Sequence, residues 1–591
     1  MLSVSESKKR QFTIFAKALA STYATLSLVS PSLNVDVPTV MCILIFGSFG
    51  FIYKTYSNTI RTTCIQSKVI AATLSLFTVL GENLLGWAYD HRSSGGLICL
   101  LFIYWGLFVI FELLLNAMYF HLSNIKSCSF HKRDIANKHV KKVFLISFSL
   151  LWCVYFCFFM NQYPGSLSCD SPAQLRQAMG DMPYENANPL INTLVLTICV
   201  KLGLFIGNSV NCGIALYTLF QFTLVALIFA YTITVLYKTG ANRWIIVFSQ
   251  LFFNCMPYNI FYAIGMWKDT FFAIFFLASI AYFYECLYLS ASSGVQSVSL
   301  YRKIILFVLI LISSLSRNSG WSSLLTFGIV LLIYAIKNKL QLVIALARLV
   351  ISGVLCSLIL VSVIYPFFGI LDNGGIEVGL SVPLQQIARV VAYNKDFSEE
   401  DYQMINDILP ADQIKDLYDP TISDPIKFSV NREPLKENLR NYAKLWVNLG
   451  LKNPKSYLDA YIDLTKCYWY PDETGWTWDT RIFENPYGVT RTPLLFPQID
   501  IEQIFYVQCH KQDVLYTSSI ILWIAIVMFG FSSLSKNKLG SIMFVPLFAV
   551  YIGLMITSPV ALFRYTYGVV VCLPLIISIP FINIDSFDTH E

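Results

Sequence analysis

Long, continuous apolar runs recur along this chain and constrain its fold more than any other feature. A helix needs about 20 mostly apolar residues to cross a bilayer. Runs near that length lie at 12–30, 38–54, 69–89, 97–120, 142–160, 189–206, 211–237, 244–264, 269–289, 303–317, 320–336, 342–365, 514–534, 541–560 and 565–584. They are continuous rather than alternating, which excludes a β-barrel. We therefore expect an all-α polytopic membrane protein.

Composition supports this class. Of the 591 residues, 56% are hydrophobic and 13% are charged, about half the charged fraction of a soluble domain. Neither a zinc motif nor a P-loop nor a Rossmann fingerprint occurs in the sequence. ATP-driven work and a nucleotide-sugar donor are therefore not supported. Nothing points to nucleic acid as a partner.

The distribution of Lys and Arg predicts which side each loop faces, because cytoplasmic loops are rich in these residues. Lys8, Lys9 and Arg10 place the N-terminus in the cytoplasm. The basic segment 126–142 then also falls inside. The fifth apolar run therefore exits, and the loop 161–188 lies outside the membrane.

The run 189–206 decides the topology of everything after it. It starts at Pro189, contains Lys201 and has Gly203 and Gly207 near its end, so we interpret it as re-entrant or interfacial. The later basic loops then all face the cytoplasm, as the rule requires. This gives about 14 transmembrane helices, both termini in the cytoplasm and an extracytoplasmic region at 366–512.

The loop 161–188 is polar and acidic, and it separates two strongly apolar runs. It carries Asp170, Asp181 and Glu185 near an expected membrane boundary. Ionisable groups at membrane depth are costly and commonly functional. The alternative interpretation is an ordinary solvated loop.

Several cations lie in the short outer loops, against the positive-inside rule. They are Lys268 beside Asp269, Arg317 beside Asn318, and Arg564. Their placement at outer helix ends, on the same face as the acidic loop, favours a site that needs positive charge. The alternative is that they snorkel to lipid phosphates.

The outer region 366–512 has two further candidate features. Trp469, Trp476 and Trp478 stand among carboxylates in an aromatic-rich stretch that suits the stacking faces of a sugar acceptor. Gln385 and Arg389 lie one turn apart on an amphipathic helix, and both can address a phosphate or a sugar. An interfacial belt or domain core, and a helix that caps the domain, are the respective alternatives.

These parts suit sugar transfer from a polyprenyl phosphate. A lipid phosphate leaves as an anion, so one carboxylate base and several cations suffice. Asp170 is the candidate base. The candidate ligands of the donor phosphate are Lys268, Arg317, Arg389 and Arg564.

The order of these features resembles the GT-C superfamily of membrane glycosyltransferases, such as protein O-mannosyltransferases and aminoarabinose transferases. The resemblance covers about 142–584. It is carried by Asp170 in the first outer loop, Asn188-Pro189 at the start of the next apolar helix, and Lys268-Asp269. The segments PLQQIAR and WKD also look like a group of uncharacterised bacterial relatives.

The resemblance implies an outer active site, a catalytic acid at Asp170 and a polyprenyl-linked donor. The acceptor would be a glycan, lipid or protein of the cell envelope. Asp181 or Glu185 would be a second acidic residue, and some relatives use a divalent cation such as Mg²⁺ or Mn²⁺. This chain departs from the superfamily in lacking a clear DxD or ExD pair in the loop 161–188. Asn188, Asp269, Asn318 and Gln385 would have supporting roles.

The expected domains are an N-terminal membrane extension at 1–141, a catalytic membrane module at 142–365, an extracytoplasmic domain at 366–512 and a C-terminal membrane segment at 513–591. Two other functions remain open. A flippase, transporter or polymerase of lipid-linked glycans would use the same cations. A glycan-binding scaffold would use the outer region without chemistry.

Overall fold

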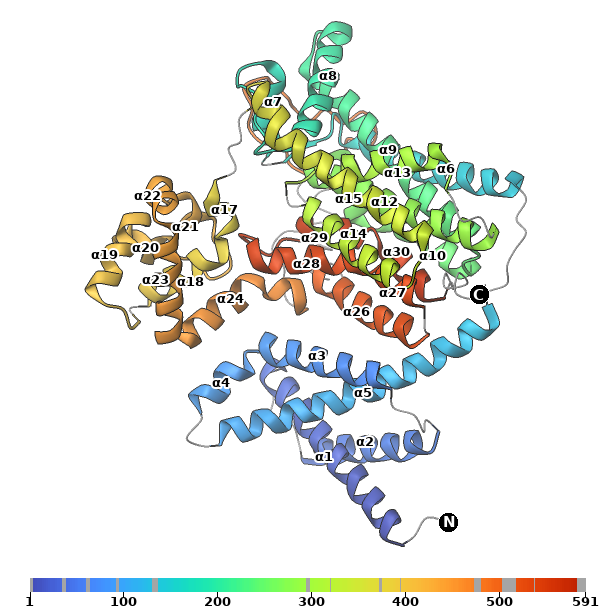
Figure 1. Ribbon diagram of the computed structural model, residues 1–591, viewed down its shortest axis with the longest axis vertical. Coiled ribbons are helices and arrows are strands. Elements are labelled where there is room, and N and C mark those ends of the chain that lie inside the picture. The colour runs from blue at the N-terminus through green and yellow to red at the C-terminus, as the bar shows by residue number, and fades with distance from the viewer. Residues whose placement is uncertain are drawn as a thin grey trace.

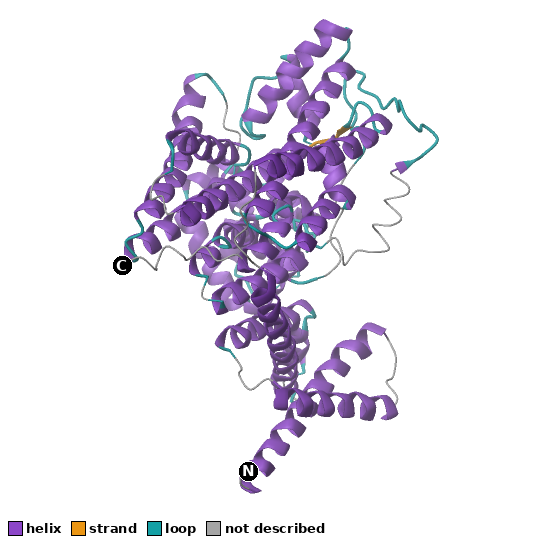
Figure 2. Ribbon diagram, turned by 90° about the vertical axis from the view of Figure 1, so that its right-hand side faces the viewer, coloured by secondary structure: helices purple, strands orange, loops and turns teal. Residues whose placement is uncertain are grey.

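The computed structural model is almost entirely helical (Figures 1 and 2). Its only named strands in the described residues are β1 (Ser166–Leu167) and β2 (Gly265–Met266), which pair in parallel. The structure describes residues 4–33, 39–59, 64–91, 95–129, 137–168, 170–293, 298–318, 320–370, 375–393, 395–471, 480–501, 517–535 and 537–581.

An N-terminal group of helices forms the lower part of Figure 1. It consists of α1 (Val4–Leu33), α2 (Thr39–Thr59), α3 (Ile65–Gly81), α4 (Leu84–Asp90) and α5 (Gly96–Ser129). Helix α1 packs against α2 and α5, and α3 packs against α5 and against α26 of the main bundle. Residues of α3 and α5, such as Leu74 and Tyr119, belong to the same hydrophobic core as the main bundle.

The main bundle combines two parts of the chain that are far apart in sequence. The first part runs from α6 (Asn137–Asn161) and the short α7 (Ser171–Met179) through α8 (Leu190–Gly207), α9 (Val210–Lys238), α10 (Arg243–Cys255), α11 (Pro257–Ile264), α12 (Lys268–Ser293), α13 (Leu300–Leu315) and α14 (Gly320–Lys337) to α15 (Gln341–Ile359), which continues into α16 (Tyr365–Phe367). The second part contains α26 (Ser518–Leu534), α27 (Lys538–Ile542), α28 (Val545–Thr557), α29 (Phe563–Val570) and α30 (Leu573–Ser578). Helix α28 packs on α14, and α29 packs on α12.

The chain is a multi-pass α-helical membrane protein. Eight helices in the described residues are long and apolar enough to span a bilayer, or up to 11 if each bent helix pair counts as one span. The bent pairs are α3 with α4 (62°), α10 with α11 (54°) and α29 with the segment Leu573–Phe581, which contains α30 (45°). The sequence predicted about 14 spans over the whole chain. That prediction counted apolar runs by hydropathy, which does not detect bends or short helices.

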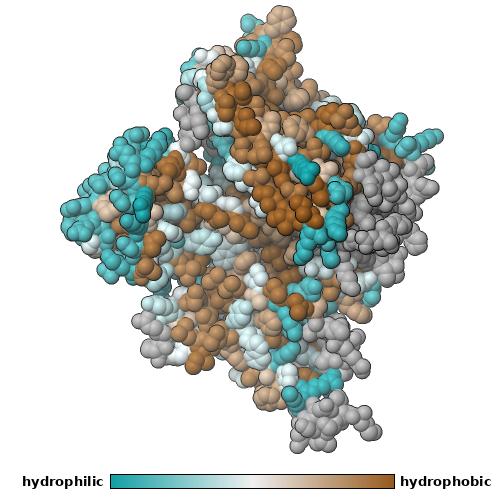
Figure 3. Space-filling view, in the orientation of Figure 1, coloured by the Kyte–Doolittle hydropathy of each residue, from teal (hydrophilic) through white to brown (hydrophobic). Residues whose placement is uncertain are grey.

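A helical domain lies beside the bundle, at the left of Figure 1. It contains α17 (Ile376–Gly379), α18 (Ser381–Ala392), α19 (Glu399–Ile408), α20 (Ile414–Leu417), α21 (Asp424–Phe428), α22 (Arg432–Glu437), α23 (Leu439–Lys452) and α24 (Pro454–Trp469). A core that includes Ile387, Ile405, Leu445 and Leu449 holds it together. Its surface is largely hydrophilic, whereas the bundle is mostly apolar (Figure 3).

Helix α12 defines two opposite ends of the bundle. At its start, the Lys268 Nζ atom lies 3.2 Å from Asp170 Oδ2. Glu285 lies about 26 Å further along the helix, at 1.5 Å per residue, and its Oε1 atom is 2.8 Å from Lys238 Nζ at the end of α9. We call the first end the Asp170 face. The separation is close to the thickness of a hydrocarbon core, about 30 Å.

Helices α8 and α9 form an antiparallel hairpin at the top of Figure 1. Helix α8 starts at the Asp170 face, where Asn192 Nδ2 donates to the Lys268 carbonyl. Its far end also returns to that face, since Asn211 at the start of α9 exchanges two hydrogen bonds with Thr490, and the nearby Thr492 amide donates to the Tyr163 carbonyl. Helix α8 is one unbroken helix that is long and apolar enough to span a bilayer.

Glycine makes the hairpin possible. A Cβ atom at Gly203 of α8 would collide with the backbone of Gly213 on α9. The sequence suggested from Gly203 and Gly207 that this segment is re-entrant or interfacial. In the structure Gly203 instead lets two continuous helices approach closely.

The helical domain lies at the Asp170 face as well. The Tyr468 hydroxyl hydrogen-bonds with Ser558 Oγ and with the Val560 carbonyl, in the loop that leads to Arg564. Ile422 forms an isolated bridge with Val560. The acidic loop, the cations Lys268 and Arg564 and the domain therefore share one face of the molecule.

Candidate functional site

The carboxylate of Asp170 lies between two cations from distant parts of the chain. Its Oδ2 atom is 3.2 Å from Lys268 Nζ and 3.2 Å from Arg564 Nη1. The side chains are 28%, 22% and 12% exposed, in the order Asp170, Lys268, Arg564. Three residues that the sequence analysis named separately thus form one partly exposed charged cluster.

The short strand pair fixes the acidic loop against the start of α12. Ser166 pairs with Gly265 and Leu167 with Met266. Just after β1, the hydroxyls of Ser168 and Ser171 both donate to the Met266 carbonyl, at 3.1 and 2.7 Å. These contacts lie on either side of Asp170 in the sequence. They hold the backbone of Asp170 beside Lys268 and do not involve the Asp170 side chain.

Two asparagines orient Lys268. The Nζ atom donates to Asn188 Oδ1 at 2.7 Å, and Asn192 Nδ2 donates to the Lys268 carbonyl at 3.3 Å. Asn188 precedes Pro189 at the start of α8, so the predicted supporting role of Asn188 corresponds to a direct contact with the cation.

Aromatic rings hold Arg564. Its Cζ atom lies 5.2 Å from the centroid of Trp267 and 4.8 Å from that of Tyr565. Its Nη2 atom donates to the Tyr565 hydroxyl at 3.0 Å. A guanidinium stacked on aromatic faces keeps its charge with little rotational freedom, so Arg564 is pre-organised to hold an anion.

Arg317 belongs to a deeper layer of the same site. Its Nη1 atom donates to the Tyr565 carbonyl at 2.7 Å and lies 3.5 Å from Asp269 Oδ1. Its guanidinium also lies over the rings of Tyr565 and Phe272. Arg317 thus joins the start of α12 to α29, and it positions the two residues next to the cations.

The neighbouring Asn318 makes a similar connection. Its Nδ2 atom donates to the Asn186 carbonyl at 2.9 Å, which ties the loop after α13 to the end of the acidic loop. Both residues of the predicted Arg-Asn pair therefore support the cluster through backbone contacts.

Two buried oxygen acceptors beside Lys268 have no hydrogen-bond partner among the described residues. They are Asp269 Oδ2 and Asn192 Oδ1, on side chains whose residues are 2% and 1% exposed. An unsatisfied buried acceptor is costly. Hydroxyl or amine donors on a substrate, or ordered water, would satisfy these atoms.

The electrostatics of Asp170 depend on its cations. Burial by itself would raise its pKa, but the positive charges of Lys268 and Arg564 outweigh burial and hold the pKa of Asp170 below its usual value. The carboxylate is therefore ionised at neutral pH and is a weak base while both ion pairs are in place.

Asp181 contacts a tyrosine outside the cluster of Asp170, Lys268 and Arg564. Asp181 Oδ2 accepts a hydrogen bond from the Tyr487 hydroxyl, and burial together with this carboxylate raises the pKa of Tyr487 to about 12. Among described residues, no group of three His, Cys, Asp or Glu side chains is placed to hold a metal ion.

Arg389 and Gln385 lie in the helical domain, away from the cations they were predicted to join. Arg389 lies 2.5 Å from Asp463 and 3.7 Å from Asp459. The Gln385 amide donates to the Asp419 carbonyl. Their contacts favour the alternative interpretation, a helix that stabilises the domain.

Trp469 was predicted to stack on an acceptor sugar, which requires an exposed ring, but the ring is buried. It is 4% exposed and packs against Phe77 of α3, with ring centroids 5.6 Å apart. It therefore belongs to the core between α24 and the N-terminal helices. Trp476 and Trp478 lie outside the described residues.

Tyr565, Trp267 and Asn192 are functional candidates that the sequence analysis missed. Trp267 and Tyr565 directly adjoin Lys268 and Arg564 in the sequence. An aromatic residue next to a misplaced cation was therefore an available signal. Asn192 had none, because its role depends on the packing of α8 beside α12.

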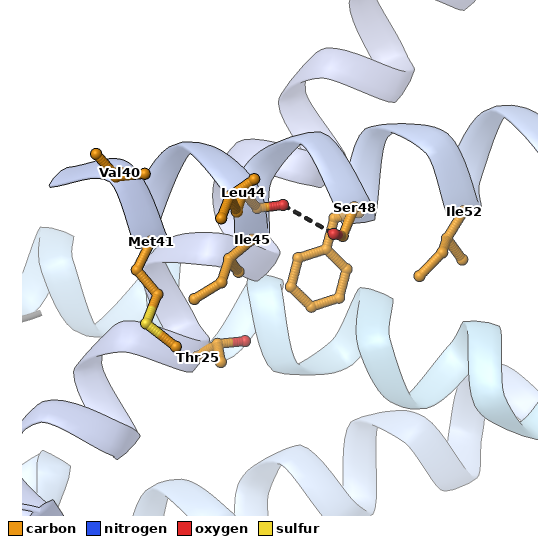
Figure 4. Close-up of a pocket in the computed structure, with 8 residues that line it drawn as sticks. Thr25, Val40, Met41, Leu44, Ile45, Ser48 and Ile52 are labelled. Carbon is orange, nitrogen blue, oxygen red and sulfur yellow. Dashed lines mark hydrogen bonds between the residues drawn. The ribbon is translucent and has the colours of Figure 1, made fainter. Parts of the chain in front are cut away.

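An open groove of about 580 Å³ lies elsewhere, between α1 and α2 (Figure 4). Its only labelled polar groups are Thr25 and Ser48, and Ser48 Oγ already donates to the Leu44 carbonyl at 2.8 Å. Aliphatic side chains such as Met41 and Ile45 make up most of the rest. This groove has the chemistry to hold apolar chains but not to catalyse a reaction.

Comparison with known proteins identifies a family without a described activity. Residues 180–583 match DUF6020, a family of unknown function. The chain belongs to the DUF6020 family. The matched region contains Lys268, Arg317 and Arg564. Asp170 lies before the matched region, but in the structure its side chain contacts Lys268 and Arg564. No curated protein and no solved structure matches the chain.

Proposed function

We propose that this protein is a membrane glycosyltransferase that moves a sugar from a polyprenyl-phosphate donor to a cell-envelope acceptor. The observation that carries the proposal is the Asp170 carboxylate held between Lys268 and Arg564 at one end of a membrane bundle. The acceptor is a glycan, a lipid or a protein.

The site contains the groups that this reaction needs. The bond between the anomeric carbon and the phosphate oxygen breaks, and the electron pair stays on the lipid phosphate. Lys268 and Arg564 stabilise that charge. A bond forms between the anomeric carbon and the acceptor oxygen, whose proton passes to Asp170. The leaving phosphate needs no proton, so a second acid is not required.

The surroundings support a substrate that carries both a negative charge and hydroxyl groups. The cations address the phosphate, while the acceptor atoms Asp269 Oδ2 and Asn192 Oδ1 offer positions for hydroxyl donors. Arg317 holds Tyr565 and Asp269 in place and does not need to touch the phosphate itself. In this proposal Asp181, which contacts Tyr487, takes no part in the proton transfer, and no step depends on a metal ion.

The order of elements supports a GT-C-like arrangement. An acidic outer loop after a transmembrane helix, a Lys-Asp pair at the start of α12 and a domain on the same face all fit that superfamily. We place the Asp170 face and the helical domain outside the cell and both termini in the cytoplasm, because Lys238 and the basic start of α6 (Lys138, Lys141 and Lys142) belong to the opposite face.

The first test is the Asp170→Asn variant. It keeps the shape of the side chain but cannot accept the proton, so we expect transfer to fall by about 10²–10⁴-fold. Purified protein in detergent would be assayed with a radiolabelled polyprenyl-phosphate sugar and envelope acceptors. Asp407→Asn on the exposed side of α19 is the matched control. Full transfer by folded Asp170→Asn would remove Asp170 from the mechanism.

A transporter, flippase or polymerase of lipid-linked glycans is the second candidate. The bent helix pairs favour it, since broken helices build the substrate sites of many transporters. Proteoliposomes without an acceptor separate the two functions. A transporter moves the lipid-linked sugar across the bilayer, whereas a transferase leaves it in place until an acceptor is added.

A further inference from the structure

Both cations of the site contact the same oxygen of Asp170. Lys268 Nζ and Arg564 Nη1 each lie 3.2 Å from Oδ2, longer than the 2.7–2.9 Å that is typical of strong charge-assisted hydrogen bonds. Among the described residues, the hydrogen bond and ion pairs of this carboxylate are made by Oδ2 and not by Oδ1. The carboxylate therefore fills a two-cation site with one oxygen and with poor geometry.

We propose that Lys268 and Arg564 form a binding site for a phosphate-class anion, and that Asp170 occupies this site only while it is empty. An arriving phosphate displaces the carboxylate, which then becomes available to a neighbouring hydroxyl. This inference rests on the proposed function and adds to it the order of events: the donor binds first, and its binding releases the base.

The cations are held independently of Asp170, so they stay in place when it leaves. Asn188 fixes Lys268 at 2.7 Å. The rings of Trp267 and Tyr565 flank Arg564. A phosphate presents several oxygens and can contact both cations at once, and the planar guanidinium suits such bidentate binding. Phosphate is thus a better match to the pair than the single carboxylate oxygen.

Asp170 also has an alternative position. It is the N-cap residue of α7 (Ser171–Met179), yet its side chain makes no capping hydrogen bond. Asp is among the preferred N-cap residues because its carboxylate accepts from the first-turn amides. The Ser171 amide donates to the Ser168 carbonyl and Pro172 has no amide hydrogen. The Ala173 amide is therefore the first-turn donor that a carboxylate displaced by phosphate can reach.

The ion pairs explain why displacement matters for chemistry. While Lys268 and Arg564 hold Asp170, their charges keep it a weak base. Once a phosphate neutralises the cations, the basicity of Asp170 rises. The donor would in this way activate the base that the transfer needs.

The test measures binding and does not depend on transfer. Purified full-length protein in detergent would be titrated with farnesyl phosphate and with inorganic phosphate, and farnesol would report binding of the chain alone. If Asp170 competes for the site, Asp170→Asn binds farnesyl phosphate about tenfold more tightly than wild type, because the competent state no longer has to form first. Asp170→Glu keeps the competing charge and stays within about threefold of wild type.

Matched variants separate competition from a general change in charge. Asp181→Asn removes a negative charge from the same loop, where Asp181 contacts Tyr487, and does not tighten binding. Lys268→Gln weakens binding at least about tenfold in both the wild-type and the Asp170→Asn background. If Asp170→Asn does not fold, Asp170→Ser removes the same competitor.

Tighter binding of both phosphates assigns recognition to the phosphate group. Tighter binding of farnesyl phosphate alone assigns it to a lipid headgroup. The inference would be overturned if folded Asp170→Asn and Asp170→Ser bind farnesyl phosphate no more tightly than wild type. It would also be overturned if Asp181→Asn tightens binding to the same extent. If binding tightens but no sugar is transferred, the anion site stands and the proposed reaction is wrong.

Discussion

At the scale of single residues, the site depends on a carboxylate that is shared by two cations. Lys268 and Arg564 lie 296 positions apart in the sequence, and the fold brings both into contact with Asp170. A buried carboxylate without these partners would have a raised pKa. With them its pKa is lowered, so the charge state of the cluster is fixed over the physiological pH range.

This charge state predicts the pH dependence of the reaction. The folded-state pKa of Asp170 is lowered, so its ion pairs contribute fully above about pH 4, the ordinary Asp value, and are lost as pH falls through the lower folded-state value. We expect the acid limb of kcat/KM, which reports the free enzyme, to lie below about pH 4. A limb near pH 6 that disappears in Asp170→Asn would contradict the lowered pKa. The control is a thermal melt of each variant at every pH.

At the scale of elements, the α8–α9 hairpin positions Asn188 and Asn192 beside Lys268. Its two helices approach closely at Gly203 and Gly213. This close packing determines where the start of α8 lies, and hence how Lys268 is oriented. The strand pair β1–β2 fixes the acidic loop in the same way from the other side.

Substitution at Gly203 tests the hairpin. Gly203→Leu forces the two helix backbones apart, so we expect a loss of about 1–3 kcal/mol in stability and a weaker site because α8 shifts. Thermal unfolding in detergent would measure it. Gly553→Leu on α28 is the control, since a Cβ atom there meets nothing within 4 Å. Equal melting temperatures for the two variants would show that the close approach is not needed.

At the scale of the whole molecule, the protein is two-sided. The acidic loop, the cations and the helical domain share the Asp170 face, where Tyr468 contacts the loop that leads to Arg564. The opposite end of the bundle carries the Lys238–Glu285 ion pair. A lipid-linked substrate would reach the Asp170 face laterally from the membrane.

Cysteine labelling tests this arrangement. In a background without native cysteines, Asn338→Cys, in the loop between α14 and α15, should react only with reagents that reach the cytoplasm. Lys436→Cys in the helical domain should react with an impermeant reagent from outside, because residue 436 is on the Asp170 face. Lys436 is about half exposed, and Asn338 is exposed, so both positions are accessible. Labelling of both from the same side would overturn the proposed topology.

The sequence by itself determined the fold class, since long apolar runs in water-poor surroundings must form helices that satisfy their own backbone hydrogen bonds. The sequence also indicated which charged residues to examine. An ionised side chain at a membrane boundary, such as that of Asp170, Lys268, Arg317 or Arg564, costs free energy unless it is paired or faces water or a ligand. Only the tertiary structure decided which of them meet. Arg389 was chosen from its place on an amphipathic helix, and it pairs with Asp459 and Asp463 inside the helical domain.

Hydropathy also gave no information on bends, so α10 and α11 were predicted as one straight span although they meet at 54°. Trp469 was expected at a surface because its neighbours are charged, but packing buried it against Phe77. Hydropathy gives the cost of placing each residue in lipid or in water, and it depends only on that residue and its neighbours in the sequence. Which residues meet depends on helix packing between segments hundreds of positions apart, and that is why only the folded chain brings Asp170 to Lys268 and Arg564.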